Sequence, residues 1–222
     1  MTRAALLLFA DGRFPSGSHA HSAGTEAACV SGGVVDGASL QAFALGRLHS
    51  TGRVDAAFAA AACSGVHDWA ELDAAYDART VSSRLRAVSR ALGRQLLRSG
   101  QRVWPGAVLE SLRAASPPEG AHHPLALGAV ARSAQLDEVE AATAALHHLA
   151  STVATSALRL LGLDPFDVYA RLAALTPIID EIAAEAGSRA RDPLDTLPAT
   201  SAPLVEILAE DHATWEVRLF AS

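Results

Sequence analysis

The sequence predicts an all-α protein, and three observations support this prediction. Half of the 222 residues are hydrophobic but only 5% are aromatic, so alanine and leucine must supply most of the core. Alanine has the highest helix propensity, and its small side chain lets helix axes approach closely. Runs of β-branched and aromatic residues, which are typical of strands, are absent from the sequence. We therefore expect a single-domain bundle of about ten helices around one long central helix, spanning residues 1–222.

The first expected element is an apolar helix over residues 4–10, followed by a turn-forming loop from Asp11 to Glu26. Pro15 lacks an N–H and fixes φ, so it should end the incoming helix. Ser22 is expected to act as the N-cap of a second helix over residues 25–30, with Glu26 near its positive end. A loop of this kind must be packed by the rest of the fold or offered to another protein.

Capping residues and glycines then divide the next part of the chain. Asp36 is expected to cap a helix that carries Leu40 on its apolar face. Gly52 should separate this helix from an alanine-rich helix over residues 56–63. Asp68, with a glutamate three residues later, should begin a further short helix.

The segment from Arg79 to Arg102 is the most basic part of the chain, with an arginine at every fourth position from 86 to 102. On a helix these arginines wind around the axis, because each step of four residues drifts by roughly 40°. Two interpretations remain open: a solvated face paired with nearby carboxylates, or a surface for an acidic partner or a nucleotide phosphate.

The longest periodic segment covers residues 136–161 and carries little charge, so we expect it to be the central helix of the bundle. Residues 116–123, rich in proline and glycine, are expected to form a surface loop before it. The pairs His122-His123 and His147-His148 are interpreted as polar positions rather than metal ligands, because adjacent residues point apart on a helix.

After the central helix, Gly162 is expected to terminate it and Asp164-Pro165 to begin the next helix. Pro177 predicts a kink or break in that helix. A polar, proline-containing stretch follows, and a last helix is expected from about residue 202.

Charge and cysteine content exclude several classes of protein. The net charge of −6 argues against general nucleic-acid binding. No segment is long and apolar enough to span a membrane, so we expect no membrane association. The apolar run over residues 4–10 is too short for an export signal. Cys29 and Cys63 have neither metal-ligand spacing nor a disulfide framework, so we expect two free thiols in a cytoplasmic protein.

The C-terminus, over residues 212–222, is unusual because it stays apolar almost to its end. Arg218, Leu219 and Phe220 stand within five residues of the last one, where most chains are polar and frayed. Apolar residues on such a tail favour docking, either onto the chain itself or onto a partner protein.

With both ends in view, the chain resembles the UreF family of urease accessory proteins. The N-terminal match comprises Asp11, Pro15, Gly17, His21, Ser22, Gly24 and Glu26, and the C-terminal match comprises His212, Arg218, Leu219, Phe220 and Ser222. Segments similar to the family also occur in the same order between them. The resemblance therefore extends over nearly the whole chain.

The resemblance implies an adaptor and not an enzyme. Proteins of this family are all-helical dimers that bind a UreD/UreH-type scaffold and recruit a UreG-type GTPase, and the assembly delivers nickel to apo-urease. By this resemblance the chain forms a homodimer, binds no metal or cofactor itself, and leaves nickel and GTP to the larger complex. The residues of the two matching motifs are then the expected partner-binding residues, with Arg218, Leu219 and Phe220 facing the scaffold.

Two alternatives use the loop directly. A small hydrolase would draw its acid, base and nucleophile from Asp11, His19, His21, Ser22 and Glu26. However, no nucleophile elbow, phosphate-binding loop or dinucleotide fingerprint accompanies them. A nickel-binding protein would use His19 and His21, since imidazole suits Ni²⁺ and residues two apart can converge in a loop.

Overall fold

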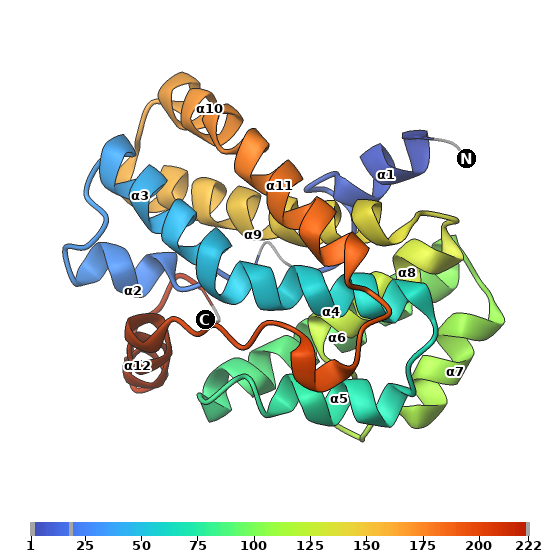
Figure 1. Cartoon of the computed structure of the whole chain (residues 1–222). Helices are drawn as coiled ribbons and strands as arrows, with labels where there is room; N and C mark the ends of the chain where they lie inside the picture. Colours follow the sequence, from blue (N-terminus) through green and yellow to red (C-terminus); the bar gives the residue numbers. More distant parts are fainter. Residues whose placement is uncertain (1–2, 18–19, 221–222) are drawn as a thin grey trace.

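The computed structural model describes residues 3–17 and 20–220, and in these residues every regular element is helical (Figure 1). The all-α prediction is confirmed. The α-helices are α1 (Arg3–Ala10), α2 (Thr25–Val30), α3 (Gly37–Arg47), α4 (Arg53–Ser64), α5 (Trp69–Asp77), α6 (Ser83–Val103), α7 (Ala107–Ala115), α8 (His123–Ser133), α9 (Glu138–Leu161), α10 (Pro165–Ala174), α11 (Thr176–Ser188) and α12 (Pro203–His212). A π-helical turn, η2 (Leu48–Gly52), joins α3 to α4, and a 3₁₀ turn, η3 (Leu194–Thr196), follows α11.

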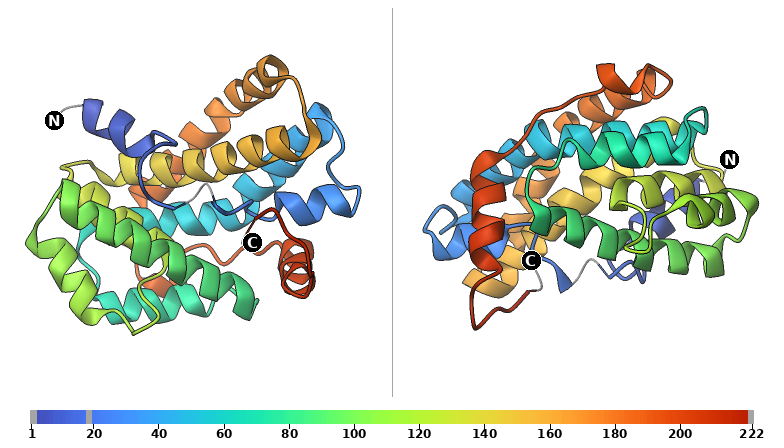
Figure 2. Two further views of the ribbon diagram at one scale, coloured as in Figure 1. Left: turned by 180° about the vertical axis from the view of Figure 1, so that it is seen from behind. Right: turned by 90° about the horizontal axis from the view of Figure 1, so that it is seen from below.

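Helix α9 is the central rod of the bundle, as the sequence predicts. It begins at a capping box in which Asp137 accepts from the Glu140 amide, and it ends at Gly162 with φ of 62°. One side of α9 packs into a core with α3, α4 and α11, and the other packs on α8 in a second core that also contains residues of α6 and α7. The helix therefore lies between two parts of the core (Figures 1 and 2).

Helices α4 and α8 cross closely because small residues line their contact. Positions 56–62 of α4 are almost completely inaccessible to solvent. On α8, a Cβ added to Gly128 would lie only 2.2 Å from the carbonyl oxygen of Ala59. The alanine-rich composition thus has a structural purpose, since it brings helix backbones nearly into contact.

Most of the expected helix starts are confirmed. Asp36 accepts a hydrogen bond from the Ser39 amide in a reciprocal capping box, and Asp68 accepts from the Ala70 and Glu71 amides. Asp164 caps α10 through the Phe166 amide, with proline at the first helical position. The break expected near Pro177 occurs between residues 174 and 176.

Two predictions about local structure are wrong. Gly52 does not separate two helices, because the π-helical turn carries the backbone through it without a break. Ser22 is not the N-cap of α2; that position is Gly24, with φ of 84°, and the Ser22 hydroxyl instead accepts from the Glu26 amide at 3.4 Å.

The interpretation of His122 as loop polarity is also wrong. Its side chain is fully buried, its Nε2 donates to Asp77 Oδ1 at 3.0 Å, and its Nδ1 lies 3.2 Å from the Ser89 hydroxyl. Burial lowers the pKa of His122, although Asp77 opposes this effect. His122 therefore ties the loop after α7 to α5 and α6.

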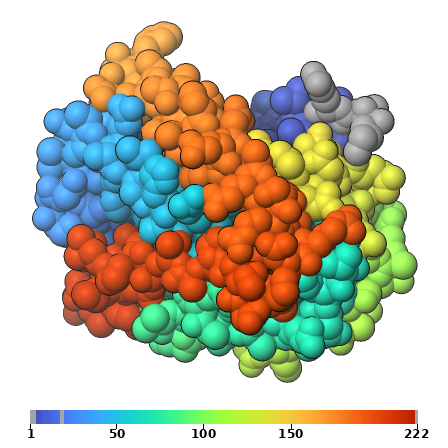
Figure 3. Space-filling view, viewed as in Figure 1, coloured from blue at the N-terminus to red at the C-terminus, as the bar shows by residue number. Residues whose placement is uncertain are grey.

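The last helix, α12, packs against α2 and α6, far from its neighbours in sequence. It follows a polar segment over residues 189–202 that runs across the outside of the bundle (Figure 1). In Figure 3 this C-terminal part, in red, lies between the blue surface of the N-terminal helices and the green surface of α5 and α6. Among the described residues, no helix is both long and apolar enough to cross a membrane.

Candidate partner-binding site

The structure joins the two terminal motifs at one carboxylate, that of Glu26. This side chain is only 6% exposed at the start of α2. Its Oε1 accepts the backbone N–H of Leu219 at 2.8 Å, and its Oε2 accepts the backbone N–H of Phe220 at 3.2 Å. His212 Nε2 donates to the same Oε2 at 2.8 Å. A single buried side chain thus holds the last helix and the tail.

Two neighbours of Glu26 explain how the chain can place a carboxylate there. Gly24 has a left-handed backbone, and an added Cβ would lie 3.1 Å from Val205 on α12 and 3.3 Å from the guanidinium of Arg47. Arg47 is buried, donates to the carbonyl of Ala23 and donates to the Thr51 hydroxyl at 3.1 Å. Arg47 therefore fixes the turn before α2, and glycine provides the room.

Arg218, Leu219 and Phe220 of the C-terminal motif do not point the same way. The Phe220 side chain is buried, with the Arg159 guanidinium 6.0 Å from its ring centroid. The side chains of Val217 and Leu219 are 84% and 74% exposed, and Arg218 is also exposed. Phe220 is therefore an internal anchor, whereas residues 217–219 face outward.

The first half of the Asp11–Glu26 loop lies elsewhere, along α6. The Pro15 carbonyl accepts from the Ser99 hydroxyl at 2.6 Å, and a Cβ on Gly17 would meet the Gln95 side chain at 2.7 Å. Asp11 forms an exposed ion pair with Arg13 at 3.1 Å, which lowers the pKa of Asp11. The expected site is thus divided, and only its second half meets the tail.

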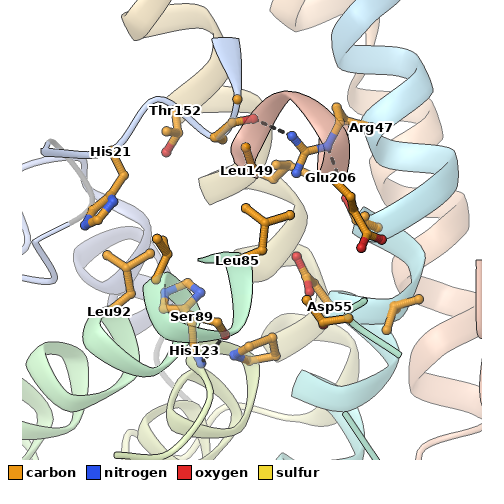
Figure 4. A pocket seen from close by; sticks show the side chains of 18 of the residues that line it. His21, Arg47, Asp55, Leu85, Ser89, Leu92, His123, Leu149, Thr152 and Glu206 are labelled. Atoms are coloured by element: carbon orange, nitrogen blue, oxygen red, sulfur yellow. Dashed lines mark hydrogen bonds between the residues drawn. The ribbon is translucent and has the colours of Figure 1, made fainter. Parts of the chain in front are cut away.

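A cavity of about 180 Å³, partly open to solvent, lies beside the Glu26 site (Figure 4). His21, Ser22 and Gly24 line it from the loop, and His212 lines it from α12. Its walls include the apolar side chains of Leu85, Leu92 and Leu149 as well as several buried polar groups.

Burial changes the protonation of the polar groups around the cavity. It raises the pKa of Asp55 to about 6, although the Tyr76 hydroxyl donates to this carboxyl at 2.7 Å. It lowers the pKa of His123 to about 3 and that of His148 to about 4, so both imidazoles are neutral at physiological pH. His148 Nε2 donates to the carbonyl of Phe9.

The loop residues that a hydrolase would need are only partly brought together in the described part of the chain, since His21 and Ser22 line the cavity but Asp11 lies apart. Asp11 is paired with Arg13 on the surface, and Glu26 is occupied by the tail. His21 lines the cavity, whereas His19 and Ser222 lie outside the described residues. Within residues 3–17 and 20–220, no group of three or more histidine, cysteine, aspartate or glutamate side chains is arranged to hold a metal ion.

Some of the regularly spaced arginines of α6, at every fourth position from 86 to 102, form ion pairs within the fold. Arg90 forms a two-pronged pair with Asp73, at 3.0 and 2.9 Å, and also reaches Asp77. Arg86 donates to the Thr80 carbonyl and lies 3.6 Å from Asp77. The pairing interpretation is confirmed for these two arginines, and Arg98 stays exposed on the surface.

A contact that the sequence analysis missed joins α12 to the start of α6. Glu206 Oε2 accepts the Ser82 amide at 2.7 Å, and Glu210 Oε1 accepts the Ser82 hydroxyl at 2.6 Å and the Arg84 amide at 3.0 Å. One sequence signal could have indicated this contact: Ser82 is the N-cap of a helix whose first turn contains no acidic residue. Carboxylates from outside the helix fill that position.

Comparisons with known proteins find similar sequences over nearly the whole chain. The sequence model of the family described as UreF matches residues 34–176. The chain is 40% identical to the urease accessory protein UreF of Mycobacterium sp. (strain JLS) over 221 residues, which cover 100% of the chain and 99% of that relative. It is 40% identical to the UreF protein of Mycolicibacterium vanbaalenii over 222 residues, covering 99% and 98% of the two chains. The UreF protein of Mycobacterium tuberculosis (strain H37Rv) is 36% identical over 222 residues, with the same coverage.

Proposed function

Because this chain belongs to the UreF family of urease accessory proteins, we propose that it is the adaptor that joins a UreD/UreH-type scaffold to a UreG-type GTPase during nickel insertion into apo-urease. A urease accessory protein is a chaperone-type protein and not an enzyme. It acts together with other proteins of urease maturation.

The observation that supports this proposal most strongly is the Glu26 carboxylate and the three groups that it holds. Two backbone amides and one imidazole fix the tail to the body of the protein. A tail held in this way loses less conformational entropy on binding than a free one does, because its backbone is already ordered. The geometry therefore suits presentation of the tail to a partner protein.

The docking side chains in this proposal are Val217, Arg218 and Leu219, which point outward from the tail. Leucine and valine offer apolar area to a groove, and arginine offers a planar cation to a carboxylate. Phe220, which is buried, keeps the tail in place and does not dock. We assign this surface to the scaffold protein.

The GTPase and a second copy of the chain must then use other surfaces. Exposed apolar side chains on α1 and α10 provide area for such contacts, with Leu7 at 73%, Phe166 at 86% and Tyr169 at 57% exposure. Exposed aromatic residues are frequent anchors of protein interfaces. The homodimer and the GTPase contact remain part of the proposal.

The proposal is tested by co-expressing the chain with the scaffold protein and the GTPase and purifying the complex by size exclusion. A chain truncated after Val217 should fold and lose the scaffold protein from the complex. The Glu216→Ala variant, which alters an exposed side chain of the same tail, should retain it. A complex that forms equally well with the truncated chain contradicts tail docking.

A direct nickel site that uses His19 and His21 is the second candidate, supported by the position of His21 on the cavity wall. Calorimetric titration with Ni²⁺ tests it. Tight, stoichiometric binding that disappears in a His19→Ala/His21→Ala variant would favour this candidate over a chain that passes metal on without holding it.

A further inference from the structure

Helix α12 forms one wall of the cavity beside the Glu26 site. Glu206, Ala209 and His212 of α12 line the space, and so do Ala145 and Leu149 of α9. A volume of about 180 Å³ is large enough for several water molecules at about 30 Å³ each. The position of α12 therefore decides how open this space is.

The fully buried contacts of α12 are mainly polar, although Leu208 and Ala209 are half-buried. Among the described residues of α12, the buried ones are Val205, Glu206 and His212, so valine is the single apolar side chain in this set. Leu204 and Ile207 are instead 67% and 65% exposed on the outer face. When a helix held by carboxylates and an imidazole detaches, water can replace its hydrogen bonds. Detaching an apolar contact costs more free energy, because its side chains become exposed to water.

The first attachment of α12 is at the N-terminus of α6. Glu206 accepts the Ser82 amide, and Glu210 accepts the hydroxyl of Ser82 and the amide of Arg84. These hydrogen bonds lower the pKa of Glu210. The attachment is thus a charged one, at the positive end of a helix of 21 residues.

The second attachment is the hydrogen bond from His212 to Glu26, two residues after Glu210 in the last turn of α12. The same carboxylate holds the amides of Leu219 and Phe220, so any movement of the tail changes the group that holds α12. The tail and the helix share one attachment point.

The segment before α12 has a fixed point from which the helix can swing. Arg79 donates to the Pro198 carbonyl at 2.9 Å, and the Thr200 hydroxyl donates to the Ser50 carbonyl at 2.7 Å. The helix itself begins three residues later, at Pro203. Residues 201 and 202 therefore form a short connection between an anchored segment and a helix with polar attachments.

We propose that α12 is a lid that partly covers this cavity, held in place by Glu210 at the start of α6 and by Glu26 at the tail. Pulling the tail away from Glu26 releases His212 and lets α12 swing out around residues 201–202. This movement goes beyond the adaptor function and does not depend on it, because it is a property of the isolated chain.

The experiment measures access to the cavity with a thiol probe. Ala145, which is 6% exposed and lines the cavity from α9, is replaced by cysteine in a Cys29→Ala/Cys63→Ala background. The rate of labelling by N-ethylmaleimide is then measured on the isolated protein. Adding Glu210→Ala should raise this rate about tenfold, because loss of a charge-assisted contact favours the open form.

The matched control is Glu216→Ala, which also removes an exposed carboxylate close to α12 but touches neither attachment, and it should leave the labelling rate unchanged. Hydrogen exchange of the chain without substitutions gives a second readout, in which the amides of α12 should exchange together and faster than those of α9. Equal labelling rates in the three proteins, or α12 amides as protected as those of α9, would overturn the lid. Neither result bears on partner binding, which the complex purification tests separately.

Discussion

At the scale of single residues, Glu26 links the N-terminal part of the chain to its C-terminal segment. It connects residues 186 to 194 positions apart through three hydrogen bonds in a buried site. A buried carboxylate is costly unless it is fully hydrogen-bonded, and here the partners all come from the C-terminal segment. The side chain therefore couples the stability of the tail to that of the N-terminal helices.

Replacing Glu26 by alanine should lower the free energy of unfolding by about 2–4 kcal/mol, because it leaves an imidazole and two amides without their acceptor. Urea denaturation followed by circular dichroism measures the change. Hydrogen exchange should show faster exchange at residues 212–220 in the same variant. A loss no greater than that of Glu216→Ala, expected within about 0.5 kcal/mol, would contradict the role of Glu26.

Asp55 gives a prediction about pH. Its folded-state pKa of about 6 is higher than the ordinary aspartate value of 3.8, so the folded protein binds this proton more tightly than the unfolded chain does. The stability contributed by Asp55 is therefore present below the lower value and is lost as the pH rises through 6. Relative to the chain with aspartate, Asp55→Asn should gain up to about 3 kcal/mol between pH 4 and pH 7.

The measurement compares urea denaturation of the two proteins at several pH values. Asparagine keeps an oxygen that can accept from Tyr76, and the titration of His123 and His148 is common to both proteins, so the difference isolates Asp55. A difference in stability that does not change between pH 4 and pH 7 would show that Asp55 is not desolvated.

At the scale of elements, local sequence predicted helix ends well and contacts between helices poorly. Asp36 and Asp164 cap their helices because the capping signal is contained in a few neighbouring residues. Gly52 was interpreted as a break, but its tertiary surroundings override the weak helix propensity of glycine. An added Cβ there would lie 3.1 Å from Leu149 of α9, so glycine serves helix packing.

Close packing of α4 and α8 leads to a test at this scale. Gly128→Ala should destabilise the protein by about 2–3 kcal/mol, because the new methyl group would meet the backbone of α4. Gly46→Ala in α3 is the matched control, since nothing lies within 4 Å of its added Cβ. It should instead stabilise the protein by up to about 1 kcal/mol through better helix propensity. Thermal unfolding measures the change in stability of both variants. Equal changes in the two variants would exclude contact with the α4 backbone as the cause.

At the scale of the whole molecule, the expected site was predicted only in part. The resemblance pointed to both termini, but it did not indicate that Glu26, His212 and Phe220 meet, because no periodicity connects residues so far apart in sequence. It also treated residues 218–220 as one docking unit, whereas the structure turns Phe220 inward and Leu219 outward. Such a division depends on how the tail lies on the body, which sequence patterns do not specify.

The cavity and the arrangement of α12 are whole-molecule properties of the same kind. In the sequence, nothing distinguishes Glu206 and Glu210 from other charged residues on a helix surface. Their contacts with the start of α6 are seen only in the folded structure. The proposed adaptor function and the proposed lid both depend on the packing of the C-terminal helix α12 against the N-terminal helix α2 (Figure 2).

The most direct test of the central claim compares the affinity of the UreD/UreH-type scaffold for the chain and for its Leu219→Ala variant. We expect binding to weaken at least about tenfold, because truncating an interface anchor typically costs more than 1 kcal/mol. Leu7→Ala removes an equally exposed leucine, 73% against 74%, at the other end of the chain and should leave the affinity unchanged. Equal affinities of the folded Leu219→Ala and Leu7→Ala variants would contradict docking through the outward face of the tail.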